Sequence, residues 1–278
     1  MGFKYHVHNH KRSSRAFHAY CIGTSKSGTH SIAGLFQPLY KAAHEPEDYE
    51  SIQLLLATQK GALDKMQLKE QLTKRDQRLG LELESSNFLS FFVESLVDQF
   101  PEAKFILTIR DAYSWLDSCL NHQLNNVLRT EDKAFWSDYR DFCFRSEPCK
   151  HAAQEKLLAQ YHLYTLDGYL SYWRRVNEKI LATIPPERLL IVRTVEIKQS
   201  IDKIAQFLHI PVETLNRSRS HLYKAKKKFD LLRQIDRDFL EQKVEFYCQD
   251  IMSQYFPAIR NVDDALKSDG KGLHRSGQ

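Results

Sequence analysis

Apolar positions along the chain follow two patterns that alternate, short continuous runs and helical repeats. Ile32, Leu35, Phe36 and Leu39 recur at helical spacing and predict a helix over 29–40. Strands are predicted at 19–22, 79–84, 104–109 and 189–192, and further helices at 50–78, 88–100, 112–128, 164–183, 199–208 and 230–254. Strands that alternate with helices predict an α/β fold, a three-layer α/β/α domain with a central, mostly parallel sheet.

Two segments depart from this alternation. Residues 129–163 combine mixed charge with an aromatic cluster and predict an inserted lid or substrate segment. The cluster is compatible with stacking on a sugar and equally with packing on the inner face of the insert. It consists of Trp136, Tyr139, Phe142 and Phe144. The polar sequence after Val262 predicts a flexible tail over 262–278.

The composition is that of a soluble globular protein, with 42% hydrophobic and 27% charged residues in 278, enough for one large core. No apolar run of about 18 residues could span a bilayer, and the N-terminal segment lacks the apolar stretch of a signal peptide. We therefore expect a cytoplasmic protein. The net charge of +5 is mild, and the basic residues are spread along the chain, which does not favour nucleic-acid binding. The sequence does not indicate the oligomeric state.

Cysteine and histidine give no pattern typical of a metal site. The five cysteines form no C-x-x-C pair and favour reduced thiols over a disulfide framework or a zinc site. His6, His8 and His10 alternate near the N-terminus, but no cysteine or carboxylate pattern accompanies them. We expect no metal.

A loop with two glycines follows the first predicted strand, in "AYCIGTSKSGTHSIAGL" (19–35). Gly23 and Gly28 have the spacing of the phosphate loop G-x-x-x-x-G-K-[ST]. Thr29 and His30 occupy the positions of its Lys and Ser or Thr, and Lys26 lies inside the loop instead. A turn from a buried strand into a helix directs backbone N–H groups and the helix dipole at one point, which favours phosphate. A turn of purely structural use is the alternative.

A second candidate for anion binding lies at the end of the predicted strand 104–109. Arg110 follows that strand directly, and Ser118 lies two helical turns further on. Parallel sheets bind ligands at the carboxyl ends of their strands. Arginine offers a bidentate fork for phosphate, and a serine hydroxyl adds a donor. For Arg110 alone, a helix cap or a surface ion pair is the alternative role.

Together the two features resemble the cofactor motifs of the sulfotransferases that use 3′-phosphoadenosine 5′-phosphosulfate (PAPS). "KSGT" (26–29) resembles the first loop, and Arg110-Asp111…Ser118 resembles R-[ND]-P-x5-S, with Ala112 where the family usually has Pro. "RTVEIKQSIDKIAQFLHIP" (193–211) looks like the family's post-strand helix, and "LESSNFL" (83–89) is similar to the E-K-S-x-x-[YF] segment of carbohydrate-modifying members. The resemblance, nearest to carbohydrate-type and bacterial sulfotransferases, covers about 17–256 of one expected domain, 1–278.

This resemblance implies an enzyme that moves a sulfuryl group from PAPS to a hydroxyl or amine and releases adenosine 3′,5′-bisphosphate. It implies that Arg110 and Ser118 hold the 3′-phosphate and that Lys26, inside the loop, stabilises charge on the leaving group. The loop residues implied to hold the 5′-phosphosulfate are Ser25, Lys26, Ser27, Gly28, Thr29, His30 and Ser31. Lys226 and Lys228, in "LYKAKKKF" (222–229), fall where the family often contacts the 3′-phosphate, although a solvated charge run is the alternative.

The acceptor must lose a proton during the attack, which calls for a general base. The resemblance places an acidic base in "KAAHEPEDYE" (41–50), where we favour Glu45 and then His44. Glu84 is third, because it ends the strand before "SSNF", near where simpler sulfotransferases keep a histidine base. A turn carboxylate and a packing histidine are the alternatives for Glu45 and His44. The E-x-S-like segment favours a carbohydrate or glycolipid acceptor, and small alcohols and phenols stay open.

Two other functions remain alternatives. A nucleotide kinase or other phosphotransferase needs a lysine on the β- and γ-phosphates with a hydroxyl on Mg²⁺ directly after it, where this chain has Thr29 and His30. A non-catalytic nucleotide-binding protein would keep the cofactor pocket and lack the base.

Overall fold

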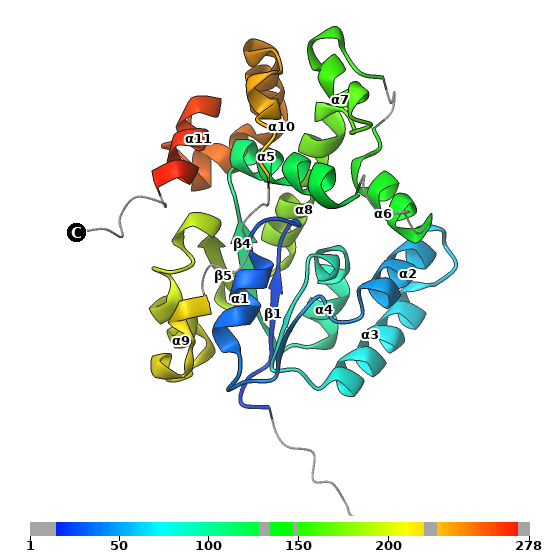
Figure 1. The fold of residues 1–278 in the computed structure, drawn as a ribbon. Helices are drawn as coiled ribbons and strands as arrows, with labels where there is room; N and C mark the ends of the chain where they lie inside the picture. The colour runs from blue at the N-terminus through cyan, green and yellow to red at the C-terminus, as the bar shows by residue number, and fades with distance from the viewer. Residues whose placement is uncertain (1–14, 128–133, 147–149, 220–226, 272–278) are drawn as a thin grey trace, which may run out of the picture.

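A computed structural model describes residues 15–127, 134–146, 150–219 and 227–271. In these residues the strands form one five-stranded sheet, and every neighbouring pair is parallel (Figure 1). The strands are β1 (Ala19–Ile22), β2 (Ala42–His44), β3 (Leu83–Ser85), β4 (Lys104–Ile109) and β5 (Leu189–Arg193), in the order β2-β3-β1-β4-β5. The central strand β1 therefore lies between β3 and β4, and the predicted three-layer α/β/α fold is confirmed.

Helices connect the strands and cover both faces of the sheet (Figure 1). Before β4 they are α1 (Thr29–Phe36), α2 (Asp48–Gln59), α3 (Lys65–Leu79) and α4 (Val93–Gln99). Between β4 and β5 they are α5 (Ala112–His122), α6 (Ala134–Phe144), α7 (Lys156–Gln160) and α8 (Leu166–Thr183). After β5 come α9 (Ile201–Leu208), α10 (Arg237–Tyr255) and α11 (Val262–Lys271). None of these described helices is both long and apolar enough to cross a membrane.

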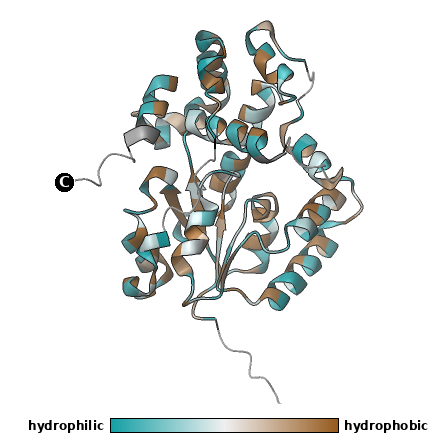
Figure 2. Ribbon diagram, in the orientation of Figure 1, coloured by the Kyte–Doolittle hydropathy of each residue, from teal (hydrophilic) through white to brown (hydrophobic). Residues whose placement is uncertain are grey.

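Alternate residues of the strands face two separate hydrophobic cores. Cys21 of β1 and Ile106 of β4 face the core beneath α1 and α9. Ile22 and Leu107, their neighbours in sequence, face the larger core formed with α4, α5 and α8. Because both faces of the central strands are covered, β4 carries apolar residues on both faces, Phe105 and Leu107 on one and Ile106 on the other. In Figure 2 the hydrophobic colour gathers on the strands, while hydrophilic residues alternate along the outer helices α3 and α10.

Several element bounds differ from the prediction. The third strand is Leu83–Ser85 and not 79–84, because α3 continues to Leu79 and ends on Gly80 in the left-handed conformation (φ 58°). The apolar segment 88–100 divides into a 3₁₀ turn, Phe88–Phe92, and α4. The helix predicted over 112–128 changes to a π-helical turn at Gln123–Val127. The edge strand β2 was not predicted, since Ala42–His44 has no apolar run.

The flexible tail predicted over 262–278 is wrong for its first part, because 262–271 is a helix. Val262 and Ala265 are buried and, with Leu266, belong to the larger core at i, i+3 and i+4 spacing. The side chain of Asn261 accepts a hydrogen bond from the backbone N–H of Asp264 at 3.0 Å, as an N-terminal cap does. Residues 272–278 lie outside the described residues.

The described parts of the insert 129–163 are largely helical and pack inward. Tyr139 and Phe144 of α6 are buried, and ring contacts join them to Phe88 and Tyr172, 5.2 and 4.9 Å away between ring centroids. Phe142 packs against Phe91 with ring centroids 5.3 Å apart. Of the two roles weighed for the aromatic cluster, packing on the inner face accounts for these contacts.

Candidate functional site

The loop between β1 and α1 is held in shape by buried hydroxyl groups. The Ser27 hydroxyl donates to the carbonyl of Thr24 at 2.7 Å and lies 2.8 Å from the hydroxyl of Thr108. The backbone N–H of Gly23 donates to the Ser90 hydroxyl at 3.0 Å. Gly23 has φ 150°, and a Cβ there would collide with the carbonyl of Thr108. The polar residues of the turn thus build the loop itself, and Ser27 is among them.

Lys26 lies within this loop in the left-handed conformation, with φ 67°. Burial lowers the pKa of Lys26 to about 8, and the Arg110 guanidinium lowers it further while the Glu45 carboxylate opposes this. The positive charge of Lys26 in turn lowers the pKa of His44 and of His122. The lysine therefore lies within electrostatic reach of four groups that belong to three segments of the chain, the 44–45 turn, the end of β4 and the end of α5.

The N-terminus of α1 carries no side-chain cap. Gly28 is the N-cap residue with φ 111°, and the first turn contains no acidic residue. Five other described helices are capped by side chains, those of Asp64, Asp111, Thr165, Asp236 and Asn261. Without such a cap, the first N–H groups of α1 and the positive end of its dipole favour an anion. Of the predicted loop residues, Thr29 is buried, Ser31 is partly buried and His30 is exposed.

Two neighbouring segments hold the loop from outside. Trp115 of α5 donates its indole N–H to the carbonyl of Ser25 at 2.8 Å. The hydroxyl of Thr194, directly after β5, donates to the carbonyl of Ser27 and lies 3.1 Å from the carbonyl of Ile109. The loop is therefore fixed to the carboxyl ends of β4 and β5. Thr194 was not predicted, although its place after the "LLIV" strand is where parallel sheets bind ligands.

Arg110 lies at the end of β4, beside the N-terminus of α5. Asp111 caps that helix by accepting the backbone N–H of Ser114 at 2.9 Å. Arg110 donates from Nε to the Ser114 hydroxyl at 3.0 Å, and the Trp173 indole N–H donates to the Arg110 carbonyl at 3.1 Å. Ser118 is partly buried one turn beyond Ser114. The cap role considered for Arg110 belongs to Asp111.

A pocket of about 110 Å³ opens beside Arg110. Its walls are mostly apolar, and two arginines are among the residues that line it. The lining residues are Arg110, Asp111, Arg193, Thr194, Val195, Phe256, Ala258 and Ile259. Thr194 belongs both to this pocket and to the contact that holds the loop. Lys226 lies outside the described residues, and Lys228 is exposed.

Glu45 and His44 lie where the edge strand β2 ends. The backbone N–H of Glu45 donates to the Ser85 carbonyl at 2.9 Å, which continues the pairing of β2 with β3 by one residue. Glu45 then turns out of the sheet with φ 48°. Burial raises the pKa of Glu45, and its hydrogen bonds with Asn87 lower it. A carboxylate of raised pKa near a cationic lysine is a reasonable proton acceptor.

Whereas the pKa of Glu45 is raised, the pKa of His44 is lowered. Its Nε2 lies 3.1 Å from the Thr29 hydroxyl and 3.6 Å from Oε1 of Glu45. Burial lowers the pKa of His44 to about 4, and the charges of His30 and Lys26 lower it further. A neutral imidazole of such low pKa is a weak base at pH 7, so the structure favours Glu45 over His44.

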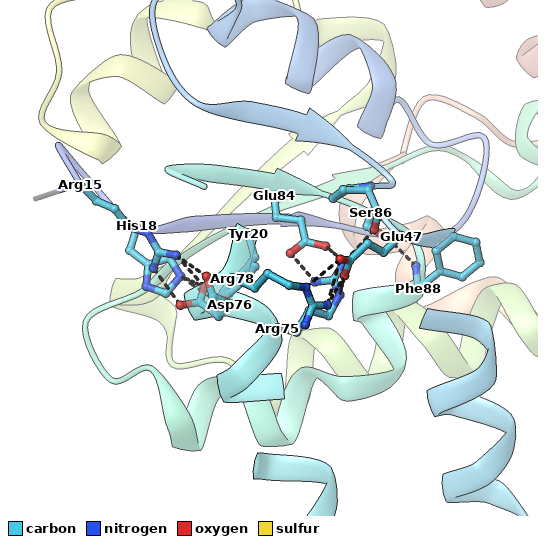
Figure 3. Close-up of polar contacts among 11 residues, drawn as sticks. Arg15, His18, Tyr20, Glu47, Arg75, Asp76, Arg78, Glu84, Ser86 and Phe88 are labelled. Carbon is cyan, nitrogen blue, oxygen red and sulfur yellow. Dashed lines mark hydrogen bonds and ion pairs between the residues drawn. The ribbon is translucent and has the colours of Figure 1, made fainter. Parts of the chain in front are cut away.

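Glu84, the third candidate base, is committed to a buried ion pair. Its carboxylate accepts two hydrogen bonds of 2.6 Å from Arg75 of α3, and both side chains are buried (Figure 3). Burial lowers the pKa of Arg75, but the Glu84 and Glu47 carboxylates more than offset this. Arg75 also donates to the carbonyl of Pro46 at 2.8 Å. Glu84 thus helps to hold the 45–47 turn, and its paired oxygens argue against a role as base.

A chain of two further side chains leads to the candidate base, and neither was predicted to belong to the site. Asn87 donates its side-chain amide N–H to Glu45, and Tyr139 donates its hydroxyl to the Asn87 amide oxygen at 2.7 Å. Asn87 lies inside "LESSNFL" (83–89), and the resemblance of that segment to carbohydrate sulfotransferases was the one sequence feature that pointed to this residue. Tyr139 was predicted only as one of the aromatic residues of the insert.

The described residues contain no group of three or more His, Cys, Asp or Glu side chains that could hold a metal ion. His6, His8 and His10 lie outside these residues.

Comparison with known proteins identifies the family of the chain. Residues 20–217 match the family model described as "Sulfotransferase domain". Among solved structures, the chain is similar to a sulfotransferase from Alicyclobacillus acidocaldarius, with 13% identity, a TM-score of 0.48 and coverage of 90% of this chain and 98% of that one. It is also similar to a sulfotransferase from Mycobacterium avium, with 13% identity, a TM-score of 0.49 and coverage of 88% and 78%. No curated protein matches. Because the family model spans most of the chain, including the loop, Arg110 and Glu45, the protein belongs to the sulfotransferase family.

Proposed function

We propose that this sulfotransferase uses PAPS as its donor and transfers the sulfuryl group in line to a hydroxyl or amine of an acceptor. The observation that carries the proposal is the position of Lys26. It stands inside the loop before a helix N-terminus that has no side-chain cap, and the charges of Arg110 and Glu45 both act on it. Such a site can stabilise an anionic leaving group and has a proton acceptor close by.

The residues of the loop fit an anionic donor. The backbone N–H groups at Gly28, Thr29 and His30 and the hydroxyls of Thr29 and Ser31 would hold the 5′-phosphate, with Ser25 and Ser27 keeping the loop in shape. When bound, PAPS supplies a sulfuryl group whose release leaves adenosine 3′,5′-bisphosphate as an anion. Lys26 would stabilise the charge that develops on that leaving group.

The far end of the donor would lie against Arg110. Arg110 and Ser118 would bind the 3′-phosphate, and the apolar pocket beside Arg110 suits the nucleoside part of the donor. Lys226 and Lys228 remain candidates for further phosphate contacts. This direction, from the loop to Arg110, follows the carboxyl ends of β1 and β4, which are neighbours in the sheet.

Glu45 would accept the proton of the acceptor. Its raised pKa makes it a stronger base than an ordinary carboxylate, and Asn87 holds one of its oxygens in place. His44 is the second candidate, and Glu84 is third because of its ion pair with Arg75. For the acceptor we propose a carbohydrate or glycolipid, on the likeness of "LESSNFL" to the corresponding segment of carbohydrate sulfotransferases, and we propose that the reaction takes place in the cytoplasm.

Calorimetry of nucleotide binding tests the donor. We expect adenosine 3′,5′-bisphosphate to bind tightly without metal, and ATP to bind weakly with or without Mg²⁺. Lys26→Met should weaken bisphosphate binding, while Lys60→Met, at an exposed lysine after α2, should not. Mg²⁺-dependent preference for ATP would refute the proposal in favour of a phosphotransferase. Bisphosphate binding without sulfuryl transfer to any acceptor, and with no effect of Glu45→Gln, would favour a non-catalytic nucleotide-binding protein.

A further inference from the structure

Tyr139 of α6 reaches Glu45 through a single side chain, that of Asn87. The Tyr139 hydroxyl donates to Oδ1 of Asn87 at 2.7 Å, and Nδ2 of Asn87 donates to Oε1 of Glu45. Tyr139 is 7% exposed and Asn87 is 3% exposed, so water does not compete for these groups. The three side chains come from the insert, from the turn after β3 and from the turn after β2.

The amide of Asn87 can be turned in two ways, and only one suits an ionised carboxylate. With its NH₂ group toward Glu45, it donates to an acceptor that has no proton of its own. With its oxygen toward Glu45, two acceptors would face each other, and the contact with the Tyr139 hydroxyl proton would also be lost. A phenol is a good donor, so the Tyr139 hydroxyl favours the first arrangement. Leaving a buried polar group without its partner is costly.

We propose that Tyr139 is a positioning residue, which orients the Asn87 amide so that its NH₂ group holds the Glu45 carboxylate. The insert that carries α6 is then part of the proton-accepting site. The significance of this contact for catalysis rests on the proposed function, which assigns Glu45 as the base. The geometry of the contact is independent of that assignment.

The charges around Glu45 support this inference. Its hydrogen bonds with Asn87 lower the pKa of Glu45, against the larger effect of burial, which raises it. The other titratable groups that act on Glu45 are Lys26 of the loop, Asp48 of α2 and His44 of β2. None of these three groups lies on α6. Removing the Tyr139 hydroxyl therefore leaves these three charged or titratable groups in place and removes only the hydrogen bond that orients Asn87.

A titration of Glu45 by NMR tests the proposal without any donor or acceptor. The protein would carry ¹³C at its glutamate carboxyl groups, and the Glu45 signal is the one that Glu45→Gln removes. Tyr139→Phe should shift the Glu45 midpoint upward. Tyr164→Phe is the matched control, because its hydroxyl also donates at 2.7 Å, but to Asp141. An unchanged or lower midpoint in Tyr139→Phe, or an equal rise in Tyr164→Phe, would overturn the proposal.

Asn87→Leu provides a second test if Tyr139→Phe does not fold, as judged by thermal melting. Loss of the amide donor should also raise the Glu45 midpoint, and no change would overturn the proposal. Binding of adenosine 3′,5′-bisphosphate to the parent protein reports separately on the proposed function. If the bisphosphate binds but the Glu45 midpoint does not shift, only the role of Tyr139 is refuted. If the midpoint shifts but the bisphosphate does not bind, only the proposed donor is refuted.

Discussion

The hydroxyl oxygen of Thr29 lies 3.1 Å from Nε2 of His44, so the first residue of α1 contacts the last residue of β2. The Ser85 hydroxyl adds a second link, since it donates to the Thr29 carbonyl at 2.7 Å. The start of α1 is therefore joined to the edge of the sheet that carries Glu45. His44 takes part in this link as a neutral side chain at pH 7, because burial lowers its pKa to about 4.

Acid should destabilise the protein through His44 and His122. Burial lowers the pKa of each to about 4, below the ordinary value of 6.5. The unfolded chain then binds protons first as the pH falls, so stability is full above about pH 6.5 and is lost between there and pH 4. After allowance for solvent screening, we expect each histidine to lower the free energy of unfolding at pH 5 by about 1 kcal/mol. Urea unfolding at pH 7.5 and pH 5 should show a smaller loss for His122→Gln than for the parent; an equal loss would contradict this.

Bisphosphate affinity should decline as the pH rises through about 8. Burial lowers the pKa of Lys26 to about 8, and only its protonated form attracts the anion. Binding should therefore be strongest below that pH and should take up protons near it. Calorimetry in two buffers of different ionisation enthalpy measures the uptake. Lys26→Met should remove it, and an undiminished uptake in that variant would assign it to another group.

Loss of the Arg110 side chain should weaken binding of adenosine 3′,5′-bisphosphate. Removing a charged contact to phosphate costs about 2 to 4 kcal/mol, so we expect a substantial loss of affinity in Arg110→Ala. Arg174→Ala is the control, because Arg174 is an exposed residue of α8 that pairs with Glu178. Calorimetry measures both, and wild-type affinity in Arg110→Ala would refute the role of Arg110.

A side chain at Gly28 should distort the loop. Its φ of 111° is strained for an L residue, and a Cβ would lie 2.7 Å from Cδ1 of Ile197. We expect Gly28→Ala to lower the free energy of unfolding by about 1 to 3 kcal/mol and to weaken nucleotide binding. Shortening the neighbour in Gly28→Ala/Ile197→Val should recover part of the loss. Gly61→Ala, where a Cβ meets no atom within 4 Å, should cost less by chemical unfolding.

The two carboxylates considered as base should respond differently to neutralisation. Glu84→Gln removes the buried carboxylate that Arg75 binds through two hydrogen bonds and leaves Arg75 with Glu47, and loss of a buried charged partner typically costs about 3 to 5 kcal/mol of stability. Glu45→Gln should fold with little loss and still bind adenosine 3′,5′-bisphosphate, but transfer sulfuryl groups far more slowly. Thermal melting and donor turnover with an acceptor separate the two. Full turnover in Glu45→Gln would remove it as the base.

Residues with a strong local signal were predictable from sequence. The apolar run 104–109 is buried on both faces, so its pattern matches β4 residue for residue, and Arg110 follows directly. Gly23 and Gly28 mark a turn that side chains could not occupy. Both signals lie within a few neighbouring residues.

Features that depend on distant contacts were not predictable in the same way. The edge strand β2 owes its conformation to pairing with β3, about 40 residues later, and has no apolar run of its own. The helix at 262–271 is stabilised by packing into the core, which outweighs its polar composition. Asn87 and Tyr139 gain significance only because the fold brings them to Glu45, 42 and 94 positions away along the chain.

The strand order β2-β3-β1-β4-β5 places the proposed donor site and the proposed base at different parts of one sheet. The groups proposed to hold the donor come from the loop after β1 and from the ends of β4 and β5, while Glu45 comes from β2 at the opposite edge. On the proposed function the acceptor approaches from the β2 edge, so we expect substitutions in the insert beside Glu45 to change the choice of acceptor more than the affinity for the donor.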